Sequence, residues 1–229
     1  TWPNHNAIAK AVGIQDKPYR YYDAAKHGLD WDGMIEDLSQ AQKGDIVLLH
    51  GCCHNPTGVD LDCGQWDKVL EVIRANGLIP FMDIAYQGFG DGFEEDAFFV
   101  RALADADLSF AVSNSFSKNF SLYAERCGGL SIVCPDAQQA AQVFGQLKFN
   151  IRRNYSSPPM YGALVVSTVL GDPALKAEWQ TEVGEMRTRI KAMRQALADG
   201  LKAAGVTQDM SFIVNQVGKI YGLKFTYDG

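Results

Sequence analysis

Polar side chains of complementary chemistry follow several short apolar runs in this sequence. Asp83 and Tyr86 come at the end of one run, and Ser115-Phe116-Ser117-Lys118 follows the next. Arg126 lies just before a further apolar run. A lysine whose pKa is lowered can form a Schiff base. Hydroxyls together with an arginine can bind a dianionic phosphate, and a buried carboxylate can keep a pyridine nitrogen protonated. These residue types together predict a site for pyridoxal phosphate.

Each of these residues also has an ordinary structural explanation, and only their convergence favours chemistry. Asp83 could be a helix cap or an ion-pair partner, and Lys118 could be a solvated surface lysine. A rival set, in the segment from His50 to His54, contains two histidines and two cysteines whose donor atoms suit zinc or copper(I). Structural zinc sites usually take ligands from two separated pairs, and the sequence has no second pair. We therefore expect no metal site.

The elements that must position these residues are strands alternating with helices. Apolar runs at 45–50, 78–84, 108–114 and 128–134 have the length of buried strands. Between them, apolar spacing predicts a helix ended by Asn76-Gly77 and another over 94–106, and Asp136 can cap a third that runs to about Arg152. In this third helix Val143, Phe144 and Leu147 are expected to face inward. The fold class is therefore α/β, with a mostly parallel sheet and helices on both faces, in three layers.

Ligands of an open parallel sheet bind at the carboxyl ends of the strands, which is where the polar residues fall. After Pro173 the pattern changes, because apolar residues from Leu175 to Leu201 keep spacings of three or four. That spacing predicts one long helix, and helices of this length often bridge two domains. We therefore expect a large domain over residues 1–185 and the start of a small α/β domain over 186–229.

Composition excludes several classes of function. The 229 residues are 47% hydrophobic, and 21 Lys and Arg against 27 Asp and Glu give a net charge of −6. This balance repels phosphate backbones, so we expect no nucleic-acid partner. No apolar run approaches the roughly 20 residues that span a bilayer, so we expect no membrane partner either. Five cysteines, two of them adjacent, indicate free thiols in a reducing cytoplasm.

Several segments resemble the class I pyridoxal-phosphate aminotransferases, and more narrowly the bacterial aspartate and aromatic (tyrosine) aminotransferase group. The resemblance runs in order from residue 1 to about 215 with similar spacings. It is slightly closer to the aromatic branch in Ser113–Lys118 and Gly128–Ser131. The segments that carry it are Trp2-Pro3-Asn4-His5, His50-Gly51-Cys52-Cys53-His54-Asn55-Pro56-Thr57-Gly58, Asp83-Ile84-Ala85-Tyr86-Gln87-Gly88-Phe89, Ser115-Phe116-Ser117-Lys118-Asn119 and Arg152-Arg153-Asn154-Tyr155-Ser156-Ser157-Pro158-Pro159.

The resemblance implies a role for each matching residue. Lys118 would bind the cofactor covalently and then move a proton at the amino acid's α-carbon. Asp83 would pair with the pyridinium nitrogen, with His5 supporting it from behind and His50 lying further from the cofactor. Tyr86 would hydrogen-bond the ring's 3′-oxygen.

The same resemblance assigns the remaining contacts. Trp2 would stack on the ring, Asn55 would bind the 3′-oxygen, and both would contact substrate. The Asn55–Pro56 bond would be cis. Arg152 would reach into the neighbouring subunit's site and bind a substrate's side-chain carboxylate. The residues expected to bind the phosphate are Ser115, Ser117 and Arg126.

The activity that the resemblance implies is exchange of an amino group between an aromatic or dicarboxylic L-amino acid and 2-oxoglutarate, in a homodimer with shared active sites. Two alternatives stay open: a fragment that keeps only the fold, and another enzyme of the same pyridoxal-phosphate fold, such as a lyase or decarboxylase. Arg152 argues against the lyase. Family members are longer, so the chain is expected to be a central fragment. Its last stretch, Val217–Phe225, departs from the family pattern.

Overall fold

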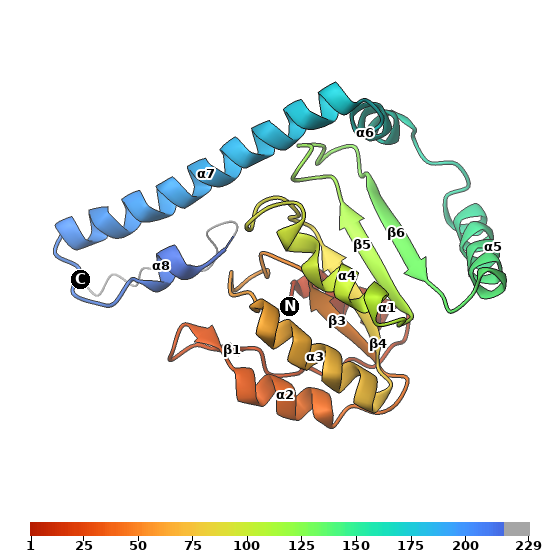
Figure 1. The fold of residues 1–229 in the computed structure, drawn as a ribbon, viewed down its shortest axis with the longest axis horizontal. Coiled ribbons are helices and arrows are strands. Elements are labelled where there is room, and N and C mark those ends of the chain that lie inside the picture. The colour runs from red at the N-terminus through yellow and green to blue at the C-terminus, as the bar shows by residue number, and fades with distance from the viewer. Residues whose placement is uncertain (218–229) are drawn as a thin grey trace.

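The computed structural model describes residues 1–217, which form two sheets and a series of helices (Figure 1). The stretch beyond Val217 that departs from the family pattern therefore lies outside the described residues. In chain order the elements are α1 (Pro3–Ala11), β1 (Tyr22–Asp23), β2 (Gly28–Leu29), α2 (Trp31–Ser39), β3 (Ile46–His50), α3 (Cys63–Asn76), β4 (Ile79–Ile84), the 3₁₀ helix η1 (Glu95–Ala97), α4 (Phe98–Asp105), β5 (Phe110–Ser115), β6 (Gly128–Val133), α5 (Ala137–Asn154), α6 (Tyr161–Gly171), α7 (Pro173–Ala203) and α8 (Phe212–Asn215).

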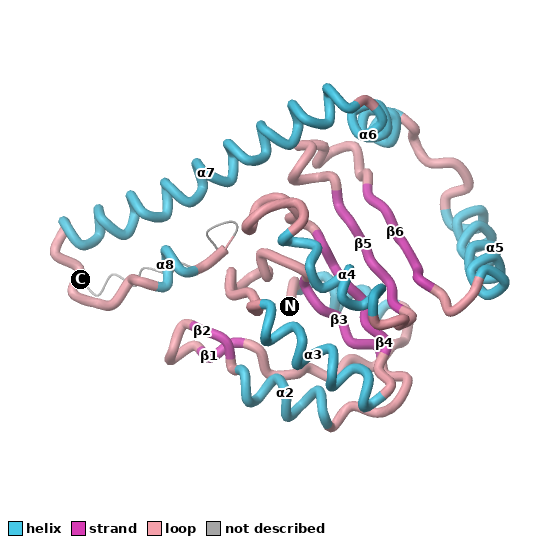
Figure 2. The backbone as a smooth tube through the Cα atoms, in the orientation of Figure 1, coloured by secondary structure: helices cyan, strands magenta, loops and turns pink. Residues whose placement is uncertain are grey.

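The larger sheet has the strand order β3-β4-β5-β6. β4 pairs in parallel with β3 and β5, whereas β6 is antiparallel to β5, with Ser115 opposite Gly128. The arrows of β5 and β6 point in opposite directions in Figure 1, and Figure 2 shows the two strands side by side. The predicted α/β fold with a mostly parallel sheet is confirmed. Because β6 is antiparallel, its first residue lies at the edge where β3, β4 and β5 end. This reversal brings Arg126, just before β6, to the same edge as the strand-end residues.

The core lies between the sheet and the helices α2, α3 and α4. α3 begins with a reciprocal capping box between Asp62 and Gln65 and ends at Gly77, whose φ of +61° suits glycine. Its buried side chains include Trp66, which stacks on Phe99 of α4 at 4.2 Å between ring centroids. α1 runs behind the sheet in Figure 1, on the opposite face, and buries none of its residues.

The helix predicted over 94–106 is present from Phe98 to Asp105, but its first turn is the 3₁₀ helix η1. Asp96 in that turn is buried, and its carboxylate accepts hydrogen bonds from the backbone N–H groups of Gly88, Gly90 and Asp91. The turn therefore holds the loop that follows β4, which the apolar spacing of this segment did not indicate.

The expectation that Phe144 faces inward is wrong for the described residues. Phe144 is 62% exposed, and α5 has no buried residue. Every residue of the neighbouring strand β6 is exposed as well, and α5 lies apart from the core in Figure 1. The spacing correctly predicted the helix and its Asp136 cap. It also predicted a covered apolar face, and nothing in residues 1–217 covers it.

α7 is a continuous helix of 31 residues whose N-terminus is capped by Asp172. It passes residue 185 without interruption, and its buried residues, Val183 and Arg194, lie on either side of that position. None of the described helices is long and apolar enough to cross a membrane.

Replacing Asp96 by Asn tests the anchoring of the loop after β4. An amide offers one oxygen and an N–H₂ group that faces backbone donors, so we expect a loss of about 3 kcal/mol in the free energy of unfolding. Urea denaturation measures this loss. Asp105→Asn, at an exposed position of α4, should change stability by less than about 0.5 kcal/mol. Equal effects from the two variants would contradict the role of Asp96.

Candidate active site

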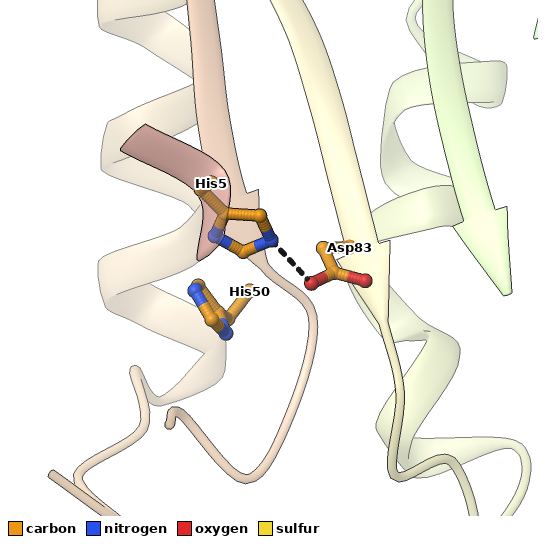
Figure 3. Close-up of side chains that lie close together, drawn as sticks. All are labelled: His5, His50 and Asp83. Carbon is orange, nitrogen blue, oxygen red and sulfur yellow. Dashed lines mark hydrogen bonds and ion pairs between the residues drawn. The ribbon is translucent and has the colours of Figure 1, made fainter. Parts of the chain in front are cut away.

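Asp83 is the charged centre of the edge formed by the strand ends. It lies near the end of β4, where its carboxylate accepts a hydrogen bond from His5 Nε2 at 2.9 Å (Figure 3). Ser113 Oγ donates a second hydrogen bond to the carboxylate at 3.2 Å. Burial raises the pKa of Asp83, but the hydrogen bond from His5 and the nearby His50 outweigh burial, so the pKa lies below its ordinary value. Asp83 is therefore a carboxylate at neutral pH.

Thr1 links the two histidines beside Asp83. Its hydroxyl oxygen lies 2.7 Å from His5 Nδ1 and 3.1 Å from His50 Nε2. A hydroxyl can donate one hydrogen bond and accept another, so the Thr1 side chain can bridge the two rings. The sequence pattern assigns no role to Thr1 or Ser113. The parallel register that pairs Asp83 with Ser113 is the signal that could have found the serine.

Burial keeps two histidines of this cluster neutral. The His50 ring lies 5.3 Å from that of His5 and 4.4 Å from that of His54. Burial lowers the pKa of His50 to about 4. Burial, together with the neighbouring His50, lowers the pKa of His54 to about 2. At neutral pH these rings therefore act as hydrogen-bonding and packing groups without charge.

The loop after β3 is held by a half-buried acid. Asp60 accepts hydrogen bonds from the backbone N–H groups of Cys53 and His54 at 2.5 and 2.7 Å. The ring of His54 stacks on Tyr21 at 4.0 Å between centroids. The Asn55–Pro56 bond is cis, which confirms the expectation for this position. The loop places Asn55, half-buried, close to the end of β3.

Lys118 lies in the turn that follows β5, beside Tyr86. Its Nζ is 5.0 Å from the centroid of the Tyr86 ring, and Tyr86 is buried. In the same turn the Ser117 N–H donates to Ser115 Oγ at 3.2 Å. Arg126, just before the neighbouring strand β6, donates to the Tyr123 carbonyl at 3.0 Å.

Trp2 and Arg152 occupy different surroundings. The Trp2 ring meets His5 edge to face at 5.4 Å, so it belongs to the cluster around Asp83. Arg152 is exposed on α5 and hydrogen-bonds Ser156. Figure 1 shows α5 beyond β6, away from the ends of β3 and β4. The structure thus brings together most of the predicted site residues but not Arg152.

Within residues 1–217, one group of candidate metal ligands has its ligand atoms within 4.8 Å of one another: His5, His50 and Asp83. These are the residues of Figure 3, already joined by the His5–Asp83 hydrogen bond. The rival set of His50, Cys52, Cys53 and His54 is not assembled as a metal site in this part of the chain.

Comparison with known proteins decides the family. The model of the family described as aminotransferase class I and II matches residues 1–222. The chain belongs to this family. It is 52% identical over 229 residues to a tyrosine aminotransferase of Klebsiella pneumoniae and 53% identical over 229 residues to an aromatic-amino-acid aminotransferase of Escherichia coli. Both alignments cover 100% of this chain and 56% of the relative, so the chain spans about half the length of these relatives.

A solved structure supports the same assignment. The aromatic-amino-acid aminotransferase of Burkholderia pseudomallei, crystallised with covalently bound pyridoxal phosphate, superposes with a TM-score of 0.93 at 52% identity. The superposition covers 95% of this chain and 55% of that protein. The family resemblance and the fold class expected from the sequence are confirmed.

The buried His54 predicts loss of stability in acid. An unfolded histidine binds a proton below about pH 6.5, whereas His54 in the folded chain binds one only near pH 2. Stability therefore falls as the pH decreases from about 6.5 towards 2, by about 2 kcal/mol at pH 5.

The free energy of unfolding of His54→Asn, measured by urea denaturation at pH 7 and pH 5, should fall by about 2 kcal/mol less than that of the wild type between the two values. His27→Asn, at an exposed position of the β1–β2 hairpin, controls for the loss of one histidine. A pH dependence of His54→Asn equal to that of the wild type would refute the account.

Proposed function

We propose that this chain carries the pyridoxal phosphate site of an aminotransferase that exchanges an amino group between an aromatic or dicarboxylic L-amino acid and 2-oxoglutarate. The observation that carries the proposal is the ionised Asp83 at the strand edge that also holds Lys118. Membership of the aminotransferase family and the pyridoxal phosphate bound in the Burkholderia relative support it.

The donor set of the described residues fits this cofactor. The Asp83 carboxylate stays charged at neutral pH, which suits a protonated pyridine nitrogen. Hydrogen bonds from His5 to one carboxylate oxygen and from Ser113 to the other hold the Asp83 side chain in place. The hydroxyls of Ser115 and Ser117, together with the guanidinium of Arg126, suit a phosphate dianion. Lys118 is half-buried beside Tyr86, where a primary amine can reach an aldehyde.

Each residue then has a defined task. When bound, the cofactor supplies an electron sink for the pair released at the α-carbon. Lys118 attaches the cofactor and afterwards moves the proton at the amino acid's α-carbon. Tyr86 and Asn55 donate hydrogen bonds to the ring oxygen, and Asn55 also contacts substrate. Trp2 stacks on the ring and closes one side of the substrate position.

Arg152 supports a homodimer with shared sites. Its exposed position on α5, apart from the Asp83 cluster, suits a residue that binds the side-chain carboxylate of a substrate held by a second copy. Such an anchor favours exchange with 2-oxoglutarate over a lyase or decarboxylase reaction. We further propose a large domain over residues 1–185, a second domain starting at 186, and a cytoplasmic location.

Borohydride reduction tests the role of Lys118. Incubating the wild-type chain with pyridoxal phosphate and reducing it should leave one covalent adduct on Lys118, identified by peptide mass spectrometry. Lys118→Ala should lose this adduct completely, because no other predicted site residue has a primary amine. Lys176→Ala, at an exposed lysine of α7, should keep it. Adduct formation in Lys118→Ala at the wild-type level would refute the assignment.

Asp83→Asn tests the carboxylate. The variant keeps the shape of the side chain but removes the charge that pairs with a pyridinium, so the dissociation constant of pyridoxal phosphate should rise about tenfold to a hundredfold. Equilibrium dialysis measures it directly. Asp105→Asn on α4 is the control, and unchanged affinity in Asp83→Asn would contradict the pairing.

A further inference from the structure

Helix α7 contacts the backbone of the Lys118 turn through one side chain. The indole N–H of Trp179 donates to the carbonyl oxygen of Asn119 at 2.7 Å. Asn119 is the residue directly after Lys118. A side chain 60 positions away in the sequence therefore fixes the peptide that follows the lysine.

Two aromatic rings pack against the same indole. The Trp179 ring stacks on Phe120 at 4.6 Å and meets Phe93 at 4.4 Å between centroids. Phe120 in turn meets Phe116 edge to face at 5.5 Å. Phe116 and Phe120 flank the Lys118 turn, so the indole contacts that turn through a hydrogen bond and through packing.

The turn is also tied to the loop that carries Tyr86. Asn119 is buried, and its side-chain N–H₂ donates to the Gln87 carbonyl at 3.2 Å. α7 contacts that loop as well, because Arg187 donates to the Gly88 carbonyl at 2.8 Å. Lys118 and Tyr86, whose side chains face each other, thus lie on two backbone segments that one helix holds together.

We propose that Trp179 is a positioning residue for Lys118. By binding the Asn119 carbonyl it limits the orientations of the Lys118 backbone, and so keeps the ε-amine over the Tyr86 ring, where it meets the cofactor's aldehyde. This role rests on the proposed function. Trp179 contacts the Asn119 carbonyl and the rings of Phe120 and Phe93, so its effect on the amine is indirect.

Trp179→Phe separates the hydrogen bond from the packing, because phenylalanine keeps an aromatic ring but has no N–H. Two measurements are made. Hydrogen exchange of the amides of residues 115–121 is followed in the cofactor-free chain, and the rate at which the borohydride-trapped adduct forms on Lys118 is followed with pyridoxal phosphate. Trp66→Phe makes the same change in α3, where the indole stacks on Phe99 away from the turn, and serves as the matched control.

We expect Trp179→Phe to speed exchange of these amides about fivefold and to slow adduct formation about fivefold, as loss of one neutral hydrogen bond implies. Trp66→Phe should change neither rate. If the smaller ring destabilises the chain, benzothienylalanine at position 179, in which sulfur replaces the N–H, makes the same test at nearly unchanged ring size.

Three outcomes are distinguishable. Wild-type rates in both measurements would overturn the proposal. Faster exchange with unchanged adduct formation would overturn it too, because Trp179 would then stabilise the turn without positioning the amine. A wild-type chain that forms no adduct would instead refute the proposed function, and with it any role of Trp179 in cofactor capture.

Discussion

The hydrogen bond from His5 to Asp83 is the interaction on which the site depends. A carboxylate near the end of β4 is partly buried, and burial alone would favour its protonated form. The 2.9 Å bond from His5, with Ser113 on the other oxygen, keeps it ionised instead. An ionised acid at this point can hold a pyridine nitrogen in its protonated form, which is what makes the cofactor an electron sink.

The elements around this bond serve to bring distant residues to one edge of the sheet. Parallel pairing of β4 with β3 and β5 places the ends of three strands side by side, and the antiparallel β6 adds its beginning to the same edge. The carboxylates of Asp60 and Asp96 hold the loops after β3 and β4 by accepting backbone N–H bonds. These hydrogen bonds hold the two loops in place, and Trp179 of α7 contacts the turn that follows β5.

The sequence predicted the parts of this arrangement that depend on local pattern. Apolar runs located the strands, and Asp136 and Gly77 marked helix ends, because caps and periodicity are short-range features. The direction of β6, the Thr1 hydroxyl between two histidines and the contact of Trp179 could not be predicted this way, since each depends on residues far apart in the chain. The prediction that Phe144 faces inward was wrong for a related reason. Periodicity indicates which face of α5 is apolar but not what covers it.

The most direct test of the central claim is the protonation state of the cofactor's ring nitrogen. The chain is loaded with pyridoxal phosphate carrying ¹⁵N in the ring, and the nitrogen chemical shift is followed from pH 6 to pH 9. We expect the shift of a protonated pyridinium across this range, because Asp83 stays ionised beside it. A shift that moves to that of a neutral pyridine, as for free cofactor in the same buffer, would contradict the account.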